Sequence, residues 1–238
     1  MNIELIANLS YILSAIFFIF GLKMLGSPAT ARRGNLLSSL GMLIAIVAGL
    51  TSQGIVDYKM IAVGMFLGAV IGSLAARLVA MTSMPEMVAL FNGSGGAASL
   101  LVGWATLYGG DVSSFTAFTI LLAILIGGVT LTGSLVAYGK LSETINSAAV
   151  VFTGQRIVNS LVLIGILVAG YLFCIEPSPN NQWLYVTLAL ALLLGIMVVI
   201  PIGGADMPVV ISLLNSYSGI AACAAGFAID NNILIVAG

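Results

Sequence analysis

The stretch Met84-Pro-Glu-Met-Val-Ala-Leu-Phe-Asn-Gly-Ser-Gly-Gly-Ala-Ala-Ser99 predicts an apolar helix that carries one amide well inside it. Ser83 and Glu86 have the three-residue spacing of a capping box, and a proline is tolerated in a first helical turn. Asn92 follows eight residues along, roughly 12 Å from the start at 1.5 Å per residue. Glycine, serine and alanine come next. In a spanning helix, such small residues allow close helix contact or leave room for water.

The chain repeats this design once. Met207-Pro-Val-Val-Ile-Ser-Leu-Leu-Asn-Ser-Tyr-Ser-Gly-Ile-Ala-Ala222 aligns with the first stretch without a gap. The two stretches match at Met, Pro, Leu, Asn, Gly and Ala. Asn92 aligns with Asn215, and Ser83 aligns with Asp206. The repeat therefore predicts two helices that carry an amide at the same depth.

Composition restricts the class of protein. Hydrophobic residues make up 61% of the 238 residues and charged residues only 6%, against roughly 25% charged in soluble proteins. Too little charge is present to hydrate the surface of a soluble globule, so we expect a polytopic membrane protein. The net charge of −1 offers no basic stripe for nucleic acid. The chain has no histidine, and its two cysteines show no metal-ligand spacing, so no metal site is expected.

Apolar runs of about 20 residues can cross roughly 30 Å of hydrocarbon, and they cross it as helices. The sequence predicts an all-α, polytopic transmembrane helix bundle with eight complete spanning helices and the start of a ninth at Asn232. We treat residues 1–238 as a single transmembrane domain. The eight predicted spans are 4–25, 36–53, 58–80, 84–108, 112–139, 157–175, 182–202 and 207–228.

Basic residues predict the orientation. Six of the seven lie on connections at one side, which the positive-inside rule makes cytoplasmic: Lys23, Arg32, Arg33, Arg77, Lys140 and Arg156. The opposite connections carry Lys59 with Asp57, Asp111, Glu176 and Asp230. The amino terminus is then outside, and whatever follows the ninth helix is cytoplasmic. The cytoplasmic connection 140–156 is mildly amphipathic and is interpreted as a plain connector, a membrane-surface segment or a docking site for a soluble partner.

Asn92 and Asn215 are the first candidates for function, because a polar group near the middle of a membrane is costly unless it is paired or hydrated. Two amides at matched depth favour a polar path across the membrane, because both are flanked by hydroxyls: Ser94 beside Asn92, and Ser216, Tyr217 and Ser218 beside Asn215. The alternative is an interhelical hydrogen bond that only holds the bundle together. Ser134, in Thr130-Leu-Thr-Gly-Ser-Leu-Val-Ala-Tyr138, is the third candidate. A hydroxyl there could instead bond a carbonyl of its own helix.

Glu86 and Asp206 are the charges nearest the starts of these two helices. A carboxylate in a first turn is stabilised by the helix dipole, which explains both residues without a function. They also flank the predicted cytoplasmic ends of the path, so they are candidates for a gate. Separately, Gly64, Gly68 and Gly72 form a small-residue stripe that predicts a packing face, or an interface between copies.

Three segments resemble one known family. They are Met84-Pro-Glu-Met-Val-Ala89, Thr132-Gly-Ser-Leu-Val-Ala-Tyr-Gly-Lys-Leu141, and Gly203-Gly-Ala-Asp-Met-Pro-Val-Val-Ile-Ser-Leu-Leu-Asn-Ser-Tyr-Ser-Gly219. They closely resemble the beta subunit of proton-translocating nicotinamide nucleotide transhydrogenase. The resemblance covers essentially the whole chain, as the membrane domain of that subunit.

The resemblance implies an enzyme that transfers a hydride from NADH to NADP⁺, coupled to proton entry. It implies that NAD(H) binds an alpha subunit and NADP(H) binds a soluble domain that follows the membrane part. This chain is then expected to bind no cofactor and to transfer no hydride alone. Further implications are a bacterial inner-membrane location, a homodimer, and contact with the alpha subunit's membrane helices.

By the same resemblance, Asn92 stands where some members carry a histidine implicated in proton transfer. Ser134 and Asn215 match polar positions of the proposed channel, and Asp206 matches an acidic residue where the NADP(H) domain docks. An amide does not titrate in the working pH range. The expectation is therefore that water carries the proton past Asn92, or that the partner subunit supplies a titrating group.

Two rival functions remain open. A secondary transporter would also have parallel repeats and polar residues at mid-membrane, together with a substrate cavity and helix breaks. The glycines at 93–96 are candidates for such a break. A passive membrane anchor is the other rival, for which the two Asn-bearing helices are unnecessary.

Overall fold

The computed structural model describes residues 3–52 and 58–238, and these residues form helices and turns without a strand. Asp57, one of the charges used for the orientation, lies outside the described residues. Eight of the described helices are long and apolar enough to cross a membrane. The helices are α1 (Ile3–Leu25), α2 (Pro28–Ser52), α3 (Tyr58–Leu78), α4 (Met84–Thr106), α5 (Ser114–Leu141), α6 (Gln155–Ile175), α7 (Gln182–Val199), α8 (Met207–Ala228) and α9 (Asn232–Ala237), with 3₁₀ turns η1 (Met81–Ser83) and η2 (Gly204–Asp206). The prediction of an all-α helical bundle is confirmed.

Two helix ends differ from the prediction by more than two residues, each for a local reason. The helix predicted over 36–53 begins at Pro28, because two polar turns precede the apolar run and proline is well placed at a helix start. The helix predicted to end at 202 ends at Val199, since Pro201 has no backbone N–H with which to continue the hydrogen bonds of the helix. The predicted capping box is wrong, because the Ser83 side chain makes no capping hydrogen bond.

The chain forms two compact units. The first covers Met1–Leu78 together with Ala237, and the second covers Val79–Val236 with Gly238. In the first unit α1 and α2 pack closely, and the buried Ser14 hydroxyl donates to the carbonyl of Gly41 at 2.6 Å. Helix α3 has no buried residue. Within this unit its three stripe glycines meet no neighbour, so the predicted packing face is not formed there.

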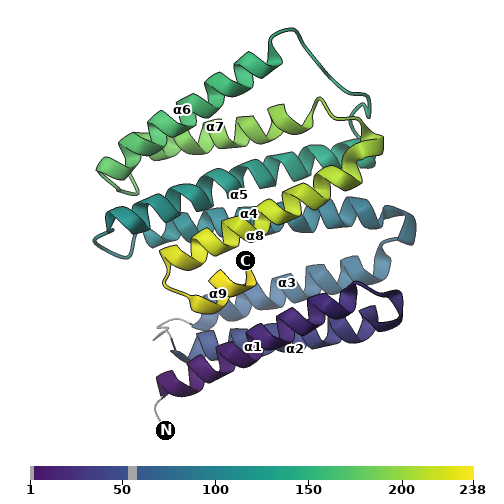
Figure 1. Ribbon diagram of the computed structural model, residues 1–238, viewed down its shortest axis with the longest axis vertical. Coiled ribbons are helices and arrows are strands. Elements are labelled where there is room, and N and C mark those ends of the chain that lie inside the picture. Colours follow the sequence, from purple (N-terminus) through teal and green to yellow (C-terminus); the bar gives the residue numbers. More distant parts are fainter. Residues whose placement is uncertain (1–2, 53–57) are drawn as a thin grey trace. The chain divides into compact units, whose positions relative to one another are not determined.

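Helix α5 is the centre of the second unit. It contacts α4, α7 and α8, and Figure 1 shows it lying between α7 on one side and α4 and α8 on the other. Glycines bring the backbones together: a Cβ at Gly96 would lie 2.8 Å from the carbonyl oxygen of Gly127. Helix α6 packs mainly on α7.

The two repeated helices begin in the same way. Both α4 and α8 follow a three-residue 3₁₀ turn, and both have proline in the first positions. They also contact each other and share α5 as a neighbour. The internal repeat seen in the sequence is therefore a repeat of structure, with the two copies packed on the same central helix.

Candidate functional site: a buried polar cluster of three helices

Asn92, Ser134 and Ser218 form one hydrogen-bonded cluster inside the second unit. The Asn92 Nδ2 donates to Ser134 Oγ at 2.9 Å, and the Ser218 Oγ donates to Asn92 Oδ1 at 2.7 Å. A longer bond of 3.3 Å runs from Ser218 Oγ to the backbone oxygen of Asn92. The Asn92 side chain is 6% exposed, and Ser134 is fully buried. One amide thus connects α4, α5 and α8.

Close packing of α4 on α5 sets these distances. A Cβ at Gly93 would lie 3.2 Å from the Cβ of Ser134, and Gly96 one turn on approaches the Gly127 backbone even more closely. Gly95 has nothing within 4 Å. The prediction of close helix contact is confirmed for Gly93 and Gly96. Helix α4 runs without interruption through all these glycines, so the helix break that a transporter site would need is absent here.

Asn215 lies outside the cluster. The buried face of α8 passes through Leu214 and Ala221, and Asn215 is displaced from that face and exposed. Ser218, three residues later, contacts Asn92 instead. Sequence reasoning named Ser218 only as a flanking hydroxyl. The signal that would have found it is its spacing, because residues 214, 218 and 221 follow the i, i+4, i+7 pattern of one helix face.

The two carboxylates are distant from the cluster along their helices. Glu86 precedes Asn92 by six residues, about 9 Å, and Asp206 precedes Ser218 by twelve, about 18 Å. Asp206 is exposed at the start of α8 and makes no side-chain capping bond. Both residues therefore lie where α4 and α8 begin, rather than beside the amide.

Thr130 was not predicted as a site residue. It is fully buried one turn before Ser134 on α5, and its hydroxyl oxygen has no hydrogen-bond partner. Its Cβ lies on the face that meets Gly96 of α4. Leaving a buried hydroxyl unbonded costs roughly 1–3 kcal/mol. The Thr130 hydroxyl is therefore a further buried polar group on α5, one turn from Ser134 of the cluster, and it is unpaired.

Lys140, in the last turn of α5, was counted only as a charge that sets orientation. Its side chain is 1% exposed. The Nζ donates to three carbonyl oxygens: Ala148 at 2.9 Å, Ile200 at 2.6 Å and Ile202 at 2.6 Å. An ammonium has three donors, and all three are used. The Lys140 ammonium thus joins the loop at Ala148 to the residues that follow α7.

Residues 142–154 contain no helix. Hydrogen bonds join this loop to the last turn of α5, to the residue that follows α7 and to η2. The amide of Gly204 donates to Ser147 O at 2.8 Å, and the amide of Val150 donates to Ile200 O at 3.2 Å. The Ser147 hydroxyl donates to Lys140 O at 2.8 Å. This connection is therefore an irregular loop and not a helix.

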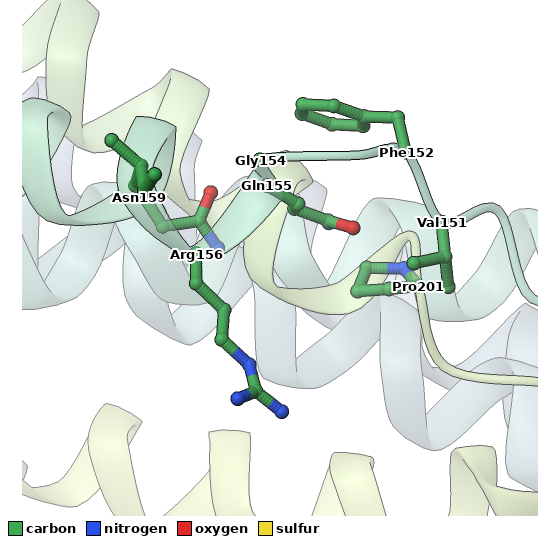
Figure 2. Close-up of a pocket in the computed structure, with 8 residues that line it drawn as sticks. Val151, Phe152, Gly154, Gln155, Arg156, Asn159 and Pro201 are labelled. Carbon is green, nitrogen blue, oxygen red and sulfur yellow. The ribbon is translucent and has the colours of Figure 1, made fainter.

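A cavity of about 560 Å³ lies beside this loop, at the start of α6. Its lining residues are Val151, Phe152, Gly154, Gln155, Arg156, Ile157, Asn159 and Pro201. Figure 2 shows Gln155 pointing toward Pro201, while Arg156 extends to the side opposite Phe152. The Gln155 amide donates to Met197 O at 3.0 Å, which fixes the start of α6 to α7. None of these residues belongs to the polar cluster.

The glycine-rich run of α4 does not have the form of a nucleotide-binding loop. This run, 93–96, lies inside α4, where Gly93 and Gly96 contact α5 and leave no concave backbone loop for a pyrophosphate. No group of three or more His, Cys, Asp or Glu residues that could hold a metal ion occurs among the described residues.

Comparison with known proteins places the chain in a family. A family model for the NAD(P) transhydrogenase beta subunit matches residues 7–238. The NAD(P) transhydrogenase subunit beta of Rhodospirillum rubrum is 37% identical over 238 residues, which cover 96% of this chain and 51% of that protein. The protein of the same name from a strain of that species gives the same values. The chain spans about half the length of these curated relatives. Because the match covers nearly the whole chain, the chain belongs to the NAD(P) transhydrogenase beta subunit family.

Proposed function

We propose that this chain is the membrane part of a transhydrogenase that couples proton flux to hydride transfer from NADH to NADP⁺. The observation that carries the proposal is the polar cluster of Asn92, Ser134 and the half-buried Ser218, which connects three helices able to cross a membrane. A polar side chain inside a membrane is costly unless it is paired or hydrated, and such groups occur in ion and proton pathways as well as in contacts between helices. Family membership supplies the type of enzyme.

Asn92 organises the path and does not itself carry a proton. A serine hydroxyl can both donate and accept, whereas the Asn92 amide has separate donor and acceptor atoms. Rotating the amide by 180° would therefore reverse the direction of both hydrogen bonds without losing either contact. Water beside the cluster would then carry the proton, with Asn92, Ser134 and Ser218 orienting it. Asn215 remains a proposed site on the exposed face of α8.

Glu86 and Asp206 form the proposed gate at the end where α4 and α8 begin. The positive-inside argument makes that end cytoplasmic in a bacterial inner membrane. The proposal places an NADP(H)-binding domain against this end and an alpha subunit, which binds NAD(H), beside the membrane helices. A homodimer is part of the same proposal. Proton flux and hydride transfer are coupled only if the two states of the gate differ in affinity for both proton and nucleotide domain.

The two rival functions fit the geometry less well. A secondary transporter would need broken helices near mid-membrane, but α4 is continuous through its glycines and α8 is continuous from Met207 to Ala228. A passive anchor would not require a buried amide bonded to two different helices. The polar cluster therefore favours the proton-translocating function.

The test uses the intact two-subunit enzyme in sealed vesicles, with proton uptake and hydride transfer between the two nucleotides measured together. Asn92→Leu removes both side-chain bonds of the cluster, so we expect proton uptake to fall at least tenfold. Asn215→Leu is the parallel variant on the aligned position of α8, and Ser94→Ala is the control, because its hydroxyl bonds only Leu90 O of its own helix.

Hydride transfer measured without a proton gradient reports on the soluble domains and should stay near the unsubstituted rate in Ser94→Ala. If Asn92→Leu pumps as well as Ser94→Ala, the cluster is not on the path and the proposed function of these residues is wrong. If Asn215→Leu alone loses pumping, the path runs along the exposed face of α8.

A further inference from the structure

Lys140 is bonded to the segments that join the central helix to the start of α8. Its ammonium holds Ala148 in the loop and Ile200 and Ile202 just after α7. Ile202 precedes η2 by two residues, and η2 leads directly into α8. The side chain is 1% exposed, so these bonds are shielded from competing water.

A second set of bonds ties the same loop to η2. Gly204 N donates to Ser147 O, and Ser147 Oγ donates to the backbone oxygen of Lys140 itself. A Cβ at Gly204 would lie 3.0 Å from the Cβ of Ser147, so the loop and η2 are in direct contact. Together these bonds fix the position of the first turn of α8 relative to the last turn of α5.

That position determines whether the polar cluster forms. Ser134 is on α5, six residues and about 9 Å before Lys140, and Ser218 is on α8. A shift of α8 along α5 would separate Ser218 from Asn92, because a hydrogen bond of 2.7 Å tolerates little lengthening. The same shift would have to break the bonds of Lys140 to Ile200 and Ile202.

We propose that Lys140 is a positioning residue of the proton path: it holds the start of α8 against α5 so that Ser218 stays bonded to Asn92. This inference rests on the proposed function. It assigns Lys140 no role as a proton carrier, because all three of its donors end on carbonyl oxygens, which have no proton to pass on. Loosening the three bonds opens the cluster and uncouples proton flux from hydride transfer.

The experiment measures protons taken up per hydride transferred in vesicles that contain the intact enzyme. Lys140→Met keeps nearly the length of the side chain and removes all three donors, and we expect the ratio to fall at least fivefold with hydride transfer within twofold of normal. Lys140→Arg keeps the charge and the donors but has a planar group. The ratio of protons to hydride in Lys140→Arg should lie between that of Lys140→Met and that of the unsubstituted enzyme. Lys23→Met is the control, since Lys23 is exposed in the first unit.

A ratio in Lys140→Met equal to that of Lys23→Met overturns the proposal. A merely structural role would lower hydride transfer, proton uptake and the amount of assembled enzyme together. If Lys140→Met does not assemble, Lys140→Arg decides, because its planar group cannot place its donors on the same three carbonyl oxygens as the ammonium does. A lowered ratio in assembled Lys140→Arg supports the proposal, and an unchanged ratio refutes it. Asn92→Leu is run in parallel: if it too pumps normally, the proposed path has failed rather than the role of Lys140 alone.

Discussion

Replacing Gly96 by alanine tests whether close contact between α4 and α5 holds the cluster together. The new Cβ would lie 2.8 Å from Gly127 O and 3.1 Å from the amide nitrogen of Leu131. Both are backbone atoms, which cannot rotate away. Ordinary contact begins at 3.4 Å, so the two helices must separate locally by about 0.6 Å. Overpacking of this kind costs roughly 1–3 kcal/mol.

The separation also reaches the cluster. Asn92 is one turn before Gly96 on the same face of α4, and its bond to Ser134 is 2.9 Å. Moving the helices apart by about 0.6 Å would bring that bond to the outer limit of a hydrogen bond. Gly96→Ala should therefore lower both the thermal stability and the proton uptake per hydride of the intact enzyme.

Gly95→Ala is the matched control, because Gly95 is the adjacent residue and is exposed, with no atom within 4 Å of the place that a Cβ would take. Alanine favours a helix over glycine by roughly 0.8–1 kcal/mol, and both variants gain this term. Thermal denaturation in detergent should place Gly96→Ala several degrees below Gly95→Ala, at roughly 2–4 °C per kcal/mol. Equal melting temperatures and equal pumping in the two variants would refute the close contact.

Two further substitutions test other parts of the cluster. Ser218→Ala removes the hydroxyl bonded to Asn92 and should lower proton uptake severalfold, whereas Ser216→Ala, whose hydroxyl bonds only Ser212 O on its own helix, should not; equal uptake in both would remove Ser218 from the path. Thr130→Val replaces an unpaired buried hydroxyl by a methyl group of similar shape. It should raise the free energy of unfolding by up to about 1 kcal/mol, and with it the melting temperature. A lower melting temperature would mean that the hydroxyl has a bonding partner in the membrane.

The helices were predictable because a spanning helix leaves a long apolar run, which can be counted directly. The start of α2 was missed because its first two turns are polar and lie outside the apolar run. The contact of Asn92 with Ser134 agrees with the expectation that both lie in one polar site. Their side chains face each other across glycines that allow the two backbones to approach, and those glycines are visible in the sequence.

Other features depend on rotation and on partners remote in the chain. Asn215 aligns with Asn92, but the α8 side chain bonded to Asn92 is that of Ser218, three residues later. The alignment predicts that the two amides lie at the same depth, and it does not reveal which residue of α8 faces α4. Lys140 bonds carbonyl oxygens 60 and 62 residues away. Every residue has a carbonyl, so no residue type signals such a partner. The bonds of the loop 142–154 to Ile200 and to η2 could not be predicted from the sequence for the same reason, because they join backbone atoms.

The central claim is that protons pass the cluster around Asn92, and Asn92→His tests it most directly. A histidine has an ordinary pKa of about 6.5, so it would add a titrating group at the centre of the cluster to a chain that has no histidine. The measurement is the pH dependence of proton uptake per hydride in vesicles, over a range of roughly one pH unit or more on either side of that value. The account predicts a new inflection in the Asn92→His enzyme that is absent when Ser94 is replaced by His. Identical pH profiles for Asn92→His and the unsubstituted enzyme would contradict it.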